Sequence, residues 1–309
     1  MNDNVTLPVT EMRNARSMDF DLLSTEQMLQ VINAEDRTVA DAVATQIPRI
    51  AEAVEAATRA LAGGGRLIYV GAGSSGRIAQ LDAVECPPTF GVTPEQVQAI
   101  VAGGEAAQAD SAAELEDDPA LGAALIAQRA VGARDVVVGL AASGTTPFTL
   151  GALREARRRG AATVAITCVP GSALAQLAGI GITPEVGPEV LTGSTRMKAG
   201  TAQKLICNML TTVTMARLGK VYSNLMVDVQ PRNAKLAARA VRIIAQAVDC
   251  SPEDARIWLT RAGGEVKTAI VMARAGVGRE RAHTLLRGAD GAVRAALQRA
   301  AADGPETRS

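Results

Sequence analysis

A glycine-rich stretch at residues 71–76, GAGSSG, has the G-x-G-x-x-G spacing and directly follows the short apolar run at 66–70. This order predicts a strand, a tight loop and then a helix. Backbone N–H groups at the start of a helix attract anions, and the hydroxyls of Ser74 and Ser75, next to Gly76, add further donors. The stretch therefore predicts a phosphate-binding loop.

A second stretch of the same kind, AASGTT, lies at residues 141–146 after the apolar run at 135–140. Its candidate binding residues are Ser143, Gly144, Thr145 and Thr146. Ser and Thr are also common N-caps of helices, so one such loop alone would not distinguish a binding site from a helix cap. Two matching loops after successive strands favour a binding site. Their several hydroxyls suit a terminal phosphate monoester better than a bridging pyrophosphate.

Binding of a dinucleotide is the competing interpretation of the first loop. A dinucleotide fold needs a second strand after the helix, and an acidic residue about 20 residues beyond the loop. Here the helix runs into Pro87 and Pro88, and we expect these prolines to end it before a second strand begins. The sequence therefore favours a phosphorylated small molecule as the ligand.

Apolar runs and helical periodicity alternate along the first 248 residues. Short apolar runs predict strands at 66–70, 135–140, 162–168 and 179–186. Apolar spacings of about three, four and seven predict helices at 33–62, 76–85, 148–159, 172–177 and 205–218. This alternation predicts an α/β fold, in which helices flank a parallel sheet on both faces to form a three-layer sandwich.

The residues after 248 show helical patterns only. Predicted helices lie at 255–260, 265–273 and 277–287, and a helix at 233–248 joins them to the sheet. We therefore predict two domains. Residues 1–248 form the sheet domain with an N-terminal helical segment, and residues 249–309 form a small three-helix domain with a polar tail.

Composition excludes several classes of partner. Lysine plus arginine equals aspartate plus glutamate at 32 each, and aromatic residues make up 2% of the chain, so we expect no nucleic-acid partner. The four cysteines are far apart and the chain has one histidine, so we expect no metal, no disulfide framework and no cofactor. No signal peptide or membrane span is recognisable, which predicts a cytoplasmic protein whose partner is a small molecule.

The longest motifs of the chain resemble a known family. The paired strand, loop and helix units resemble a sugar isomerase (SIS) domain. The blocks GAGSSGRIAQLDAVECPPTFG, IVAGGE, ELEDD and LTGSTRMKAGTAQKLICNMLTT resemble signature blocks of the N-acetylmuramic acid 6-phosphate etherases. The segments TEMRNARSMDFDLLST and KVYSNLMVDVQPRNAKL extend this resemblance over nearly the whole chain. The glucokinase regulatory protein is similar in the same blocks, but it is much longer, has two SIS domains and is not catalytic.

The resemblance implies cleavage of the ether that links D-lactate to C3 of the sugar, giving N-acetylglucosamine 6-phosphate in amino-sugar recycling. An ether oxygen is a poor leaving group. Opening the sugar to its C1 aldehyde makes the C2 proton acidic, so a base can remove it while an acid protonates the departing lactate oxygen, and water then adds back. Two carboxyl groups in different environments can divide these tasks. The family pattern places Glu85 as the acid, and Glu116 as the second catalytic carboxylate, either the C2 base or a helper to it.

A third polar cluster lies at the start of a predicted helix, in GSTRMK. Ser194, Thr195 and Lys198 are candidates for binding the phosphate or the lactate carboxylate, with an N-cap and a solvated charge as the alternative.

Helix length bears on assembly. Glu85 follows Ser75 by ten residues, which is about 15 Å along a helix, whereas the reacting carbons lie only a few bonds from the phosphate. The resemblance implies a homodimer, and we expect composite sites at the subunit boundary, with the helix at 205–218 in the interface.

Two other functions stay open, a non-catalytic sugar-phosphate sensor and a SIS aldose–ketose isomerase. Neither of these would release lactate.

Overall fold

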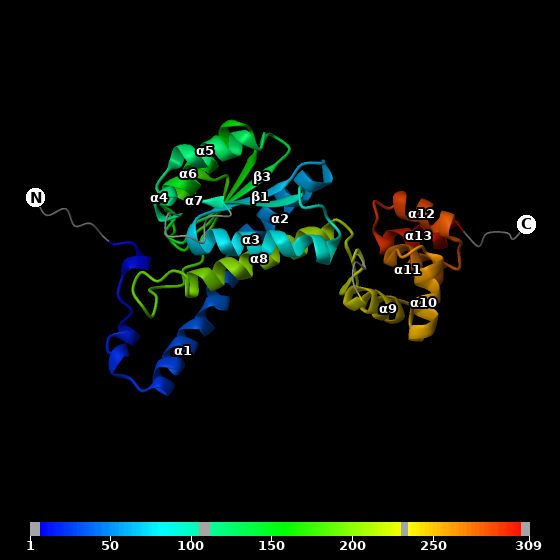
Figure 1. The fold of residues 1–309 in the computed structure, drawn as a ribbon, viewed down its shortest axis with the longest axis horizontal. Helices are drawn as coiled ribbons and strands as arrows, with labels where there is room; N and C mark the ends of the chain where they lie inside the picture. The colour runs from blue at the N-terminus through cyan, green and yellow to red at the C-terminus, as the bar shows by residue number, and fades with distance from the viewer. Residues whose placement is uncertain (1–6, 105–111, 230–233, 304–309) are drawn as a thin grey trace, which may run out of the picture. The chain divides into compact units, whose positions relative to one another are not determined.

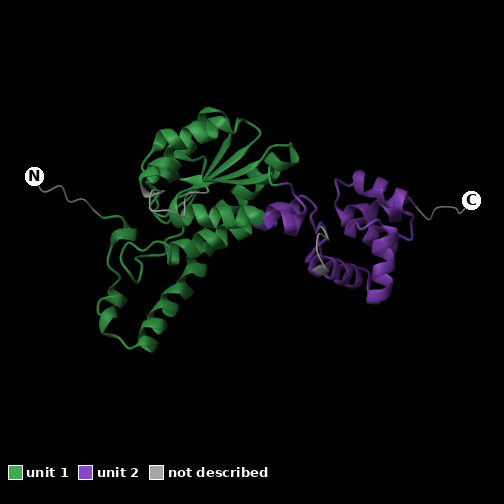
Figure 2. Cartoon of the chain, in the orientation of Figure 1, with its two compact units in different colours: residues 1–84, 94–211 green, residues 85–93, 212–309 purple. Residues whose placement is uncertain are grey.

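The structure is a computed structural model that describes residues 7–104, 112–229 and 234–303 (Figure 1). The chain divides into two compact units (Figure 2). The first contains residues Met1–Val84 and Pro94–Thr211, and the second contains Glu85–Thr93 and Thr212–Ser309.

A five-stranded parallel sheet forms the centre of the first unit. Its strand order is β2-β1-β3-β4-β5, and the strands are β1 (Leu67–Gly71), β2 (Val97–Val101), β3 (Val136–Leu140), β4 (Ala162–Ile166) and β5 (Ile180–Ile182). The residues of β1 and β3 are buried along their whole length, as expected for parallel strands covered on both faces. Gly71 pairs with Val101 on one side and with Leu140 on the other, so these strands end at the same edge of the sheet.

Helices cover both faces of this sheet. On one face α5 (Pro119–Gln128), α6 (Pro147–Arg158) and α7 (Ala173–Leu177) pack on a core that includes Ile68, Val137 and Phe148 (Figure 1). On the other face lie α2 (Ile47–Ala62) and the first turns of α3 (Gly73–Phe90) and α8 (Lys198–Arg217). The predicted fold class, a parallel sheet flanked by helices in three layers with a helical C-terminal part, is confirmed.

The remaining elements of the first unit are short or peripheral. They are η1 (Val9–Glu11), η2 (Ala15–Ser17), η3 (Phe20–Leu22), α1 (Thr25–Ala44) and α4 (Ala112–Glu116). The single helix predicted at 33–62 is two helices, α1 and α2. A break at Thr45 and Gln46 separates them, because Pro48 takes the N-terminal position that proline favours in a new helix.

The expectation that two prolines end the helix after the first loop is wrong. Helix α3 continues through Pro87 and Pro88 to Phe90, and the strand β2 that we expected to be missing follows it. Proline removes an N–H donor, but its fixed φ is compatible with a helix. The last turn keeps buried contacts at Cys86 and Phe90, so packing offsets the lost hydrogen bonds.

The second unit consists of a small hairpin and helices. The hairpin strands are β6 (Val221–Tyr222) and β7 (Leu225–Met226), and the helices are α9 (Ala234–Val248), α10 (Pro252–Arg261), α11 (Val266–Ala275), α12 (Arg279–Arg287) and α13 (Val293–Asp303). Four helices, not three, follow residue 249 among the described residues. The fourth, α13, occupies a stretch that we had assigned to the end of the domain and its tail. The predicted domain boundary at Val248 coincides with the end of α9, inside the second unit, and it stays a prediction.

No helix in the described ranges is both long and apolar enough to cross a membrane. Across the same ranges, no group of three or more His, Cys, Asp or Glu side chains is placed to hold a metal ion.

Helices α5 and α6 approach each other closely through two glycines. A Cβ atom placed on Gly151 would lie 2.0 Å from the carbonyl oxygen of Pro119, and one placed on Gly122 would lie 2.1 Å from that of Phe148. Real Cβ atoms do not come this close to a backbone oxygen, so the two helices can keep this spacing only with glycine at both positions.

This packing predicts the effect of a single methyl group. Replacing a helical glycine by alanine should gain about 1 kcal/mol of helix propensity, but Gly151→Ala must push two helices apart, so we expect a net loss of about 1–3 kcal/mol in the free energy of unfolding. Chemical denaturation measures this loss. The matched control is Gly132→Ala, where an added Cβ meets no atom within 4 Å. Equal stability of both variants would contradict the close approach.

Candidate active site

The structure brings the two predicted phosphate loops to one edge of the sheet. The first loop follows β1 at Gly71 and continues directly into α3, with Ser74, Ser75 and Gly76 in the first turn of the helix. The second loop follows β3 at Leu140, which pairs with Gly71. Parallel pairing in this register places the two loops side by side, at the carboxyl ends of the strands where α/β folds bind ligands.

The second loop presents its hydroxyls around a tightly packed glycine. The hydroxyl oxygens of Ser143 and Thr145 lie 2.9 Å apart, and the backbone N–H of Thr145 donates to the Ser143 hydroxyl at 3.3 Å. Gly144 has a φ of 70°, and a Cβ placed on it would lie 2.2 Å from the hydroxyl oxygen of Ser172. Thr146 precedes α6, yet its side chain makes no capping hydrogen bond. The start of α6 therefore keeps donors that a side-chain cap would otherwise occupy.

Glu116 contacts the first loop. It ends α4, and its carboxylate oxygen Oε1 would lie 2.9 Å from a Cβ placed on Gly73, which has a φ of 52°. Burial raises the pKa of Glu116, the neighbouring charge of Asp117 raises it further, and Arg77 at the start of α3 opposes both effects. A half-buried carboxylate with a raised pKa beside a predicted phosphate-binding loop is typical of a group that exchanges protons.

Glu85 lies on the same helix as Ser75, but in the second unit, and its side chain is exposed. Ten residues of α-helix correspond to about 15 Å, so α3 does not bring Glu85 and Ser75 together within one chain. The catalytic role of Glu85 stays a prediction.

Asp82, one turn before Glu85, is a buried carboxyl group that sequence reasoning missed. It accepts a hydrogen bond from the Tyr69 hydroxyl at 2.9 Å and one from the Thr211 hydroxyl at 3.3 Å. Burial raises its pKa, while these two hydroxyls and the charge of Lys204 oppose the rise. The available signal was the position of this acid: Asp82 follows Ala79 by three residues and precedes Cys86 by four, so it lies on the buried stripe of the helix.

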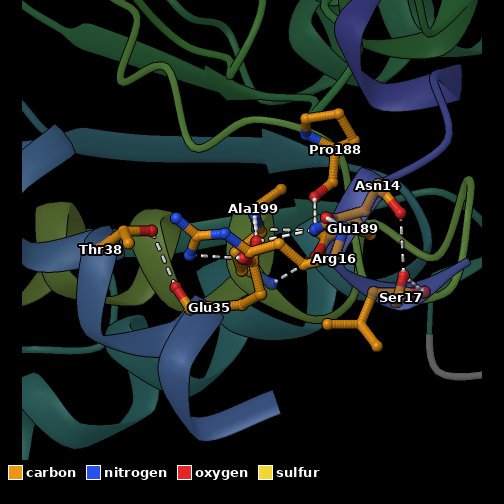
Figure 3. Close-up of polar contacts among 10 residues, drawn as sticks. Asn14, Arg16, Ser17, Glu35, Thr38, Pro188, Glu189 and Ala199 are labelled. Atoms are coloured by element: carbon orange, nitrogen blue, oxygen red, sulfur yellow. Dashed lines mark hydrogen bonds and ion pairs between the residues drawn. The ribbon is translucent and has the colours of Figure 1, made fainter. Parts of the chain in front are cut away.

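The third predicted cluster has a different arrangement from the one expected. The Glu189 carboxylate accepts the backbone N–H groups of Lys198 at 2.9 Å and Ala199 at 3.0 Å, so a protein carboxylate already occupies the start of α8 (Figure 3). The side-chain Nζ of Lys198 lies 2.6 Å from Oε2 of Glu35, and its side chain is 3% exposed. In this structure Lys198 therefore has a structural role, because its side chain pairs with Glu35 of α1. Ser194 and Thr195 precede it, half-buried, and substrate contact for all three residues stays a prediction.

The partner of Lys198 is the centre of a buried polar network. Glu35 also accepts a hydrogen bond from Asn14 at 2.7 Å, and Arg16 lies 3.2 Å from its other oxygen (Figure 3). Burial disfavours the charge of Glu35, but Lys198, Asn14 and Arg16 together outweigh it and hold its pKa below the usual value. Asn14 donates as well to the carbonyl of Pro188 at 3.1 Å. The network thus fixes the N-terminal segment to the loop that leads into α8.

Two of the resemblance motifs extend beyond the described residues. Glu105, which ends IVAGGE, and residues 230–233 of the segment KVYSNLMVDVQPRNAKL lie outside them.

The fold and its two loops define a class of protein. The SIS domain family matches residues 32–168, which include both loops. A phosphoheptose isomerase structure from Neisseria gonorrhoeae is 19% identical with a TM-score of 0.49, over 62% of this chain and 100% of its own. An N-acetylmuramic acid 6-phosphate etherase from Klebsiella aerogenes is 50% identical over 96% of this chain and 99% of its own length. Another, from Pectobacterium atrosepticum, is 51% identical over 96% and 98%. The chain belongs to the N-acetylmuramic acid 6-phosphate etherase family.

The surroundings of Glu116 predict how its pKa responds to its neighbours. Asp117→Asn removes a like charge and should lower the pKa of Glu116, whereas Arg77→Gln removes an opposite charge and should raise it. Carboxyl carbon NMR across a pH titration measures both shifts. Asp21→Asn, a change in an exposed acid on η3, is the control. A pKa of Glu116 that is the same in all three variants would contradict the placement of this carboxylate.

Proposed function

We propose that this chain cleaves the D-lactyl ether of N-acetylmuramic acid 6-phosphate and releases D-lactate and N-acetylglucosamine 6-phosphate. The observation that carries the proposal is the identity of about half over nearly the whole of both chains with relatives of that name. The hydroxyl-rich loops at the sheet edge and the carboxylate of Glu116 beside Gly73 are consistent with a phosphorylated substrate and proton-transfer chemistry.

The phosphate would bind where the two loops meet. The backbone N–H groups at the starts of α3 and α6, with the hydroxyls of Ser74, Ser75 and Ser143, supply the donors that a phosphate dianion requires. Binding at this point fixes the sugar by the end remote from the reaction, so the ring carbons extend toward the side chains around the loops.

Glu116 is proposed to act as the base in the open-chain sugar. It would take the proton from C2, the electrons of that bond would form the C2–C3 double bond, and the C3–O bond would break. A raised pKa suits this task, because a stronger base near neutral pH removes a carbon acid's proton more readily. Addition of water across the double bond then returns a proton to C2 and a hydroxyl to C3.

Glu85 is proposed to protonate the departing lactate oxygen. Glu85 is exposed on α3 and Glu116 is half-buried beside Gly73, and two carboxyl groups in different environments can divide the acid and base tasks of one reaction. The distance along α3 leads to a further proposal, that Glu85 acts in a site whose loops belong to a second copy of the chain. Two apolar side chains of α3, Leu81 and Val84, are 46% and 58% exposed, which supports an interface along this helix.

The cytoplasmic location expected from the sequence also stays a prediction.

The reaction is tested by incubation with N-acetylmuramic acid 6-phosphate and an assay for D-lactate. Glu85→Gln should lower lactate release about 10²–10⁴-fold, as expected for the loss of a general acid, while the C2 proton still exchanges with deuterated water because the base remains. Glu253→Gln, at a side chain 76% exposed in the second unit, is the matched control. If exchange and release fell together, Glu85 would be the base or a structural residue. No lactate from the unaltered chain would rule out the etherase activity.

Composite sites are tested by mixing two inactive variants. Glu85→Gln and the double variant Ser75→Ala, Ser143→Ala should each be impaired alone, and exchange of subunits should restore activity because one of the two sites in each heterodimer is then intact. Native mass spectrometry establishes that heterodimers have formed. A monomeric protein would refute the dimer, and inactive heterodimers would refute shared sites.

A further inference from the structure

The second unit contains a cavity of about 470 Å³ that opens to solvent. Its wall is formed by Gly91, Lys220, the segment after the hairpin, the start of α11 and one side of α12. The apolar part includes Val227, Val266 and Leu286. A volume of this size matches the lower range of small-molecule sites, which combine apolar walls with a few convergent polar groups.

Two lysines of the wall share one carboxylate. The Nζ atoms of Lys220 and Lys267 lie 2.9 Å and 2.7 Å from the same oxygen of Asp228. The side chain of Lys267 is only 13% exposed. Burial lowers the pKa of Lys267, although Asp228 favours the charged form. One carboxylate thus faces two ammonium groups, which leaves a positive charge without a counterpart in a partly desolvated place.

The second acid of the wall does not supply that counterpart. Glu265 accepts a hydrogen bond from the Thr268 hydroxyl at 2.7 Å, its oxygen lies 2.8 Å from Nε2 of His283, and Arg279 lies 3.6 Å away. Its charge is therefore already engaged at the start of α11.

Arg287 adds a further cation at the rim. Its side chain is exposed, and within the described part of the chain it has a weak hydrogen bond to the Thr284 hydroxyl at 3.4 Å and no acidic partner. Among the described residues of the wall, three basic side chains, Lys220, Lys267 and Arg287, thus accompany Asp228, while Glu265 is engaged with His283 and Arg279. A bound anion would remove the excess, and a guanidinium beside ammonium groups is the donor set that holds a phosphate or carboxylate.

We propose that this cavity is a binding site for a small oxyanion, the phosphate or carboxylate group of a metabolite no larger than a monosaccharide, held by Lys220, Lys267 and Arg287. The site is distinct from the loops at the sheet edge, because every residue of its wall belongs to the second unit. It adds a ligand to the helical part of the chain, for which the ether cleavage provides no role.

The single histidine of the chain makes the proposal directly testable. His283 lies in the cavity wall, and no other histidine contributes to the imidazole region of the proton NMR spectrum. Inorganic phosphate, D-lactate and N-acetylglucosamine 6-phosphate are the three probes, each compared with sodium chloride at equal ionic strength. At least one of them should produce a saturable shift of the His283 resonances, and the effective probe identifies phosphate or carboxylate as the recognised group.

Matched variants separate this site from other binding. Lys267→Met and Arg287→Gln should each weaken the apparent affinity about tenfold, the effect expected from losing one charge-assisted hydrogen bond. Arg256→Gln, on the exposed face of α10, and the double variant Ser75→Ala, Ser143→Ala should leave the response unchanged. If Lys267→Met does not fold, the exposed Arg287→Gln decides alone. No saturable shift with any probe, or an unaltered response in Arg287→Gln, would overturn the proposal.

Discussion

The site depends on the register of a parallel sheet. Gly71 of β1 pairs with Leu140 of β3, so two chain segments about 70 residues apart leave the sheet at the same level and turn into helices side by side. Each turn then needs a residue that tolerates a positive φ in a crowded place, and Gly73 and Gly144 occupy these positions. Close backbone approach at Gly73 also gives room for the carboxylate of Glu116. The hydroxyls and helix starts of the two loops follow from this alignment, whereas Glu116 is contributed by α4, which follows β2.

Sequence patterns predicted the central part of this arrangement but not its edges. The runs of β1 and β3 are hydrophobic and fully buried, and β4 contains a single polar residue, Thr163, so these strands could be recognised without structural context. Strand β2 has the short sequence VQAIV and follows a proline pair. Only the packing of Cys86 and Phe90, which local sequence does not reveal, shows that the helix continues past these prolines. Lys198 presents the same difficulty, because Ser, Thr and Lys at a helix start suggest an anion site. The helix start is occupied by Glu189, which lies in the preceding loop, and the Lys198 side chain pairs with Glu35, which is 163 positions away in the sequence.

Charge placement distinguishes the helix starts of the first unit. At α8 the Glu189 carboxylate accepts two backbone N–H groups, so the positive end of that helix dipole is neutralised by the protein. At α6 no side chain caps the helix, and α3 begins with small hydroxyl residues. The start of α8 is therefore occupied by a protein carboxylate, whereas the Thr146 side chain does not cap α6, and this difference supports the proposal that an anion binds between the two loops.

The ion pair of Lys198 and Glu35 joins residues 163 positions apart in the sequence. Contacts between such distant residues incur the full loop-closure entropy, so they form late in folding, after nearer contacts have shortened the effective chain. During synthesis the segment with Asn14 and Glu35 leaves the ribosome long before Lys198 exists. Glu35 therefore gains Lys198 as a partner only after α8 has been made, whereas Asn14 and Arg16 precede it in the chain. Because Lys198, Asn14 and Arg16 together offset the burial of Glu35, we expect the N-terminal segment to be fully fixed only once α8 has docked.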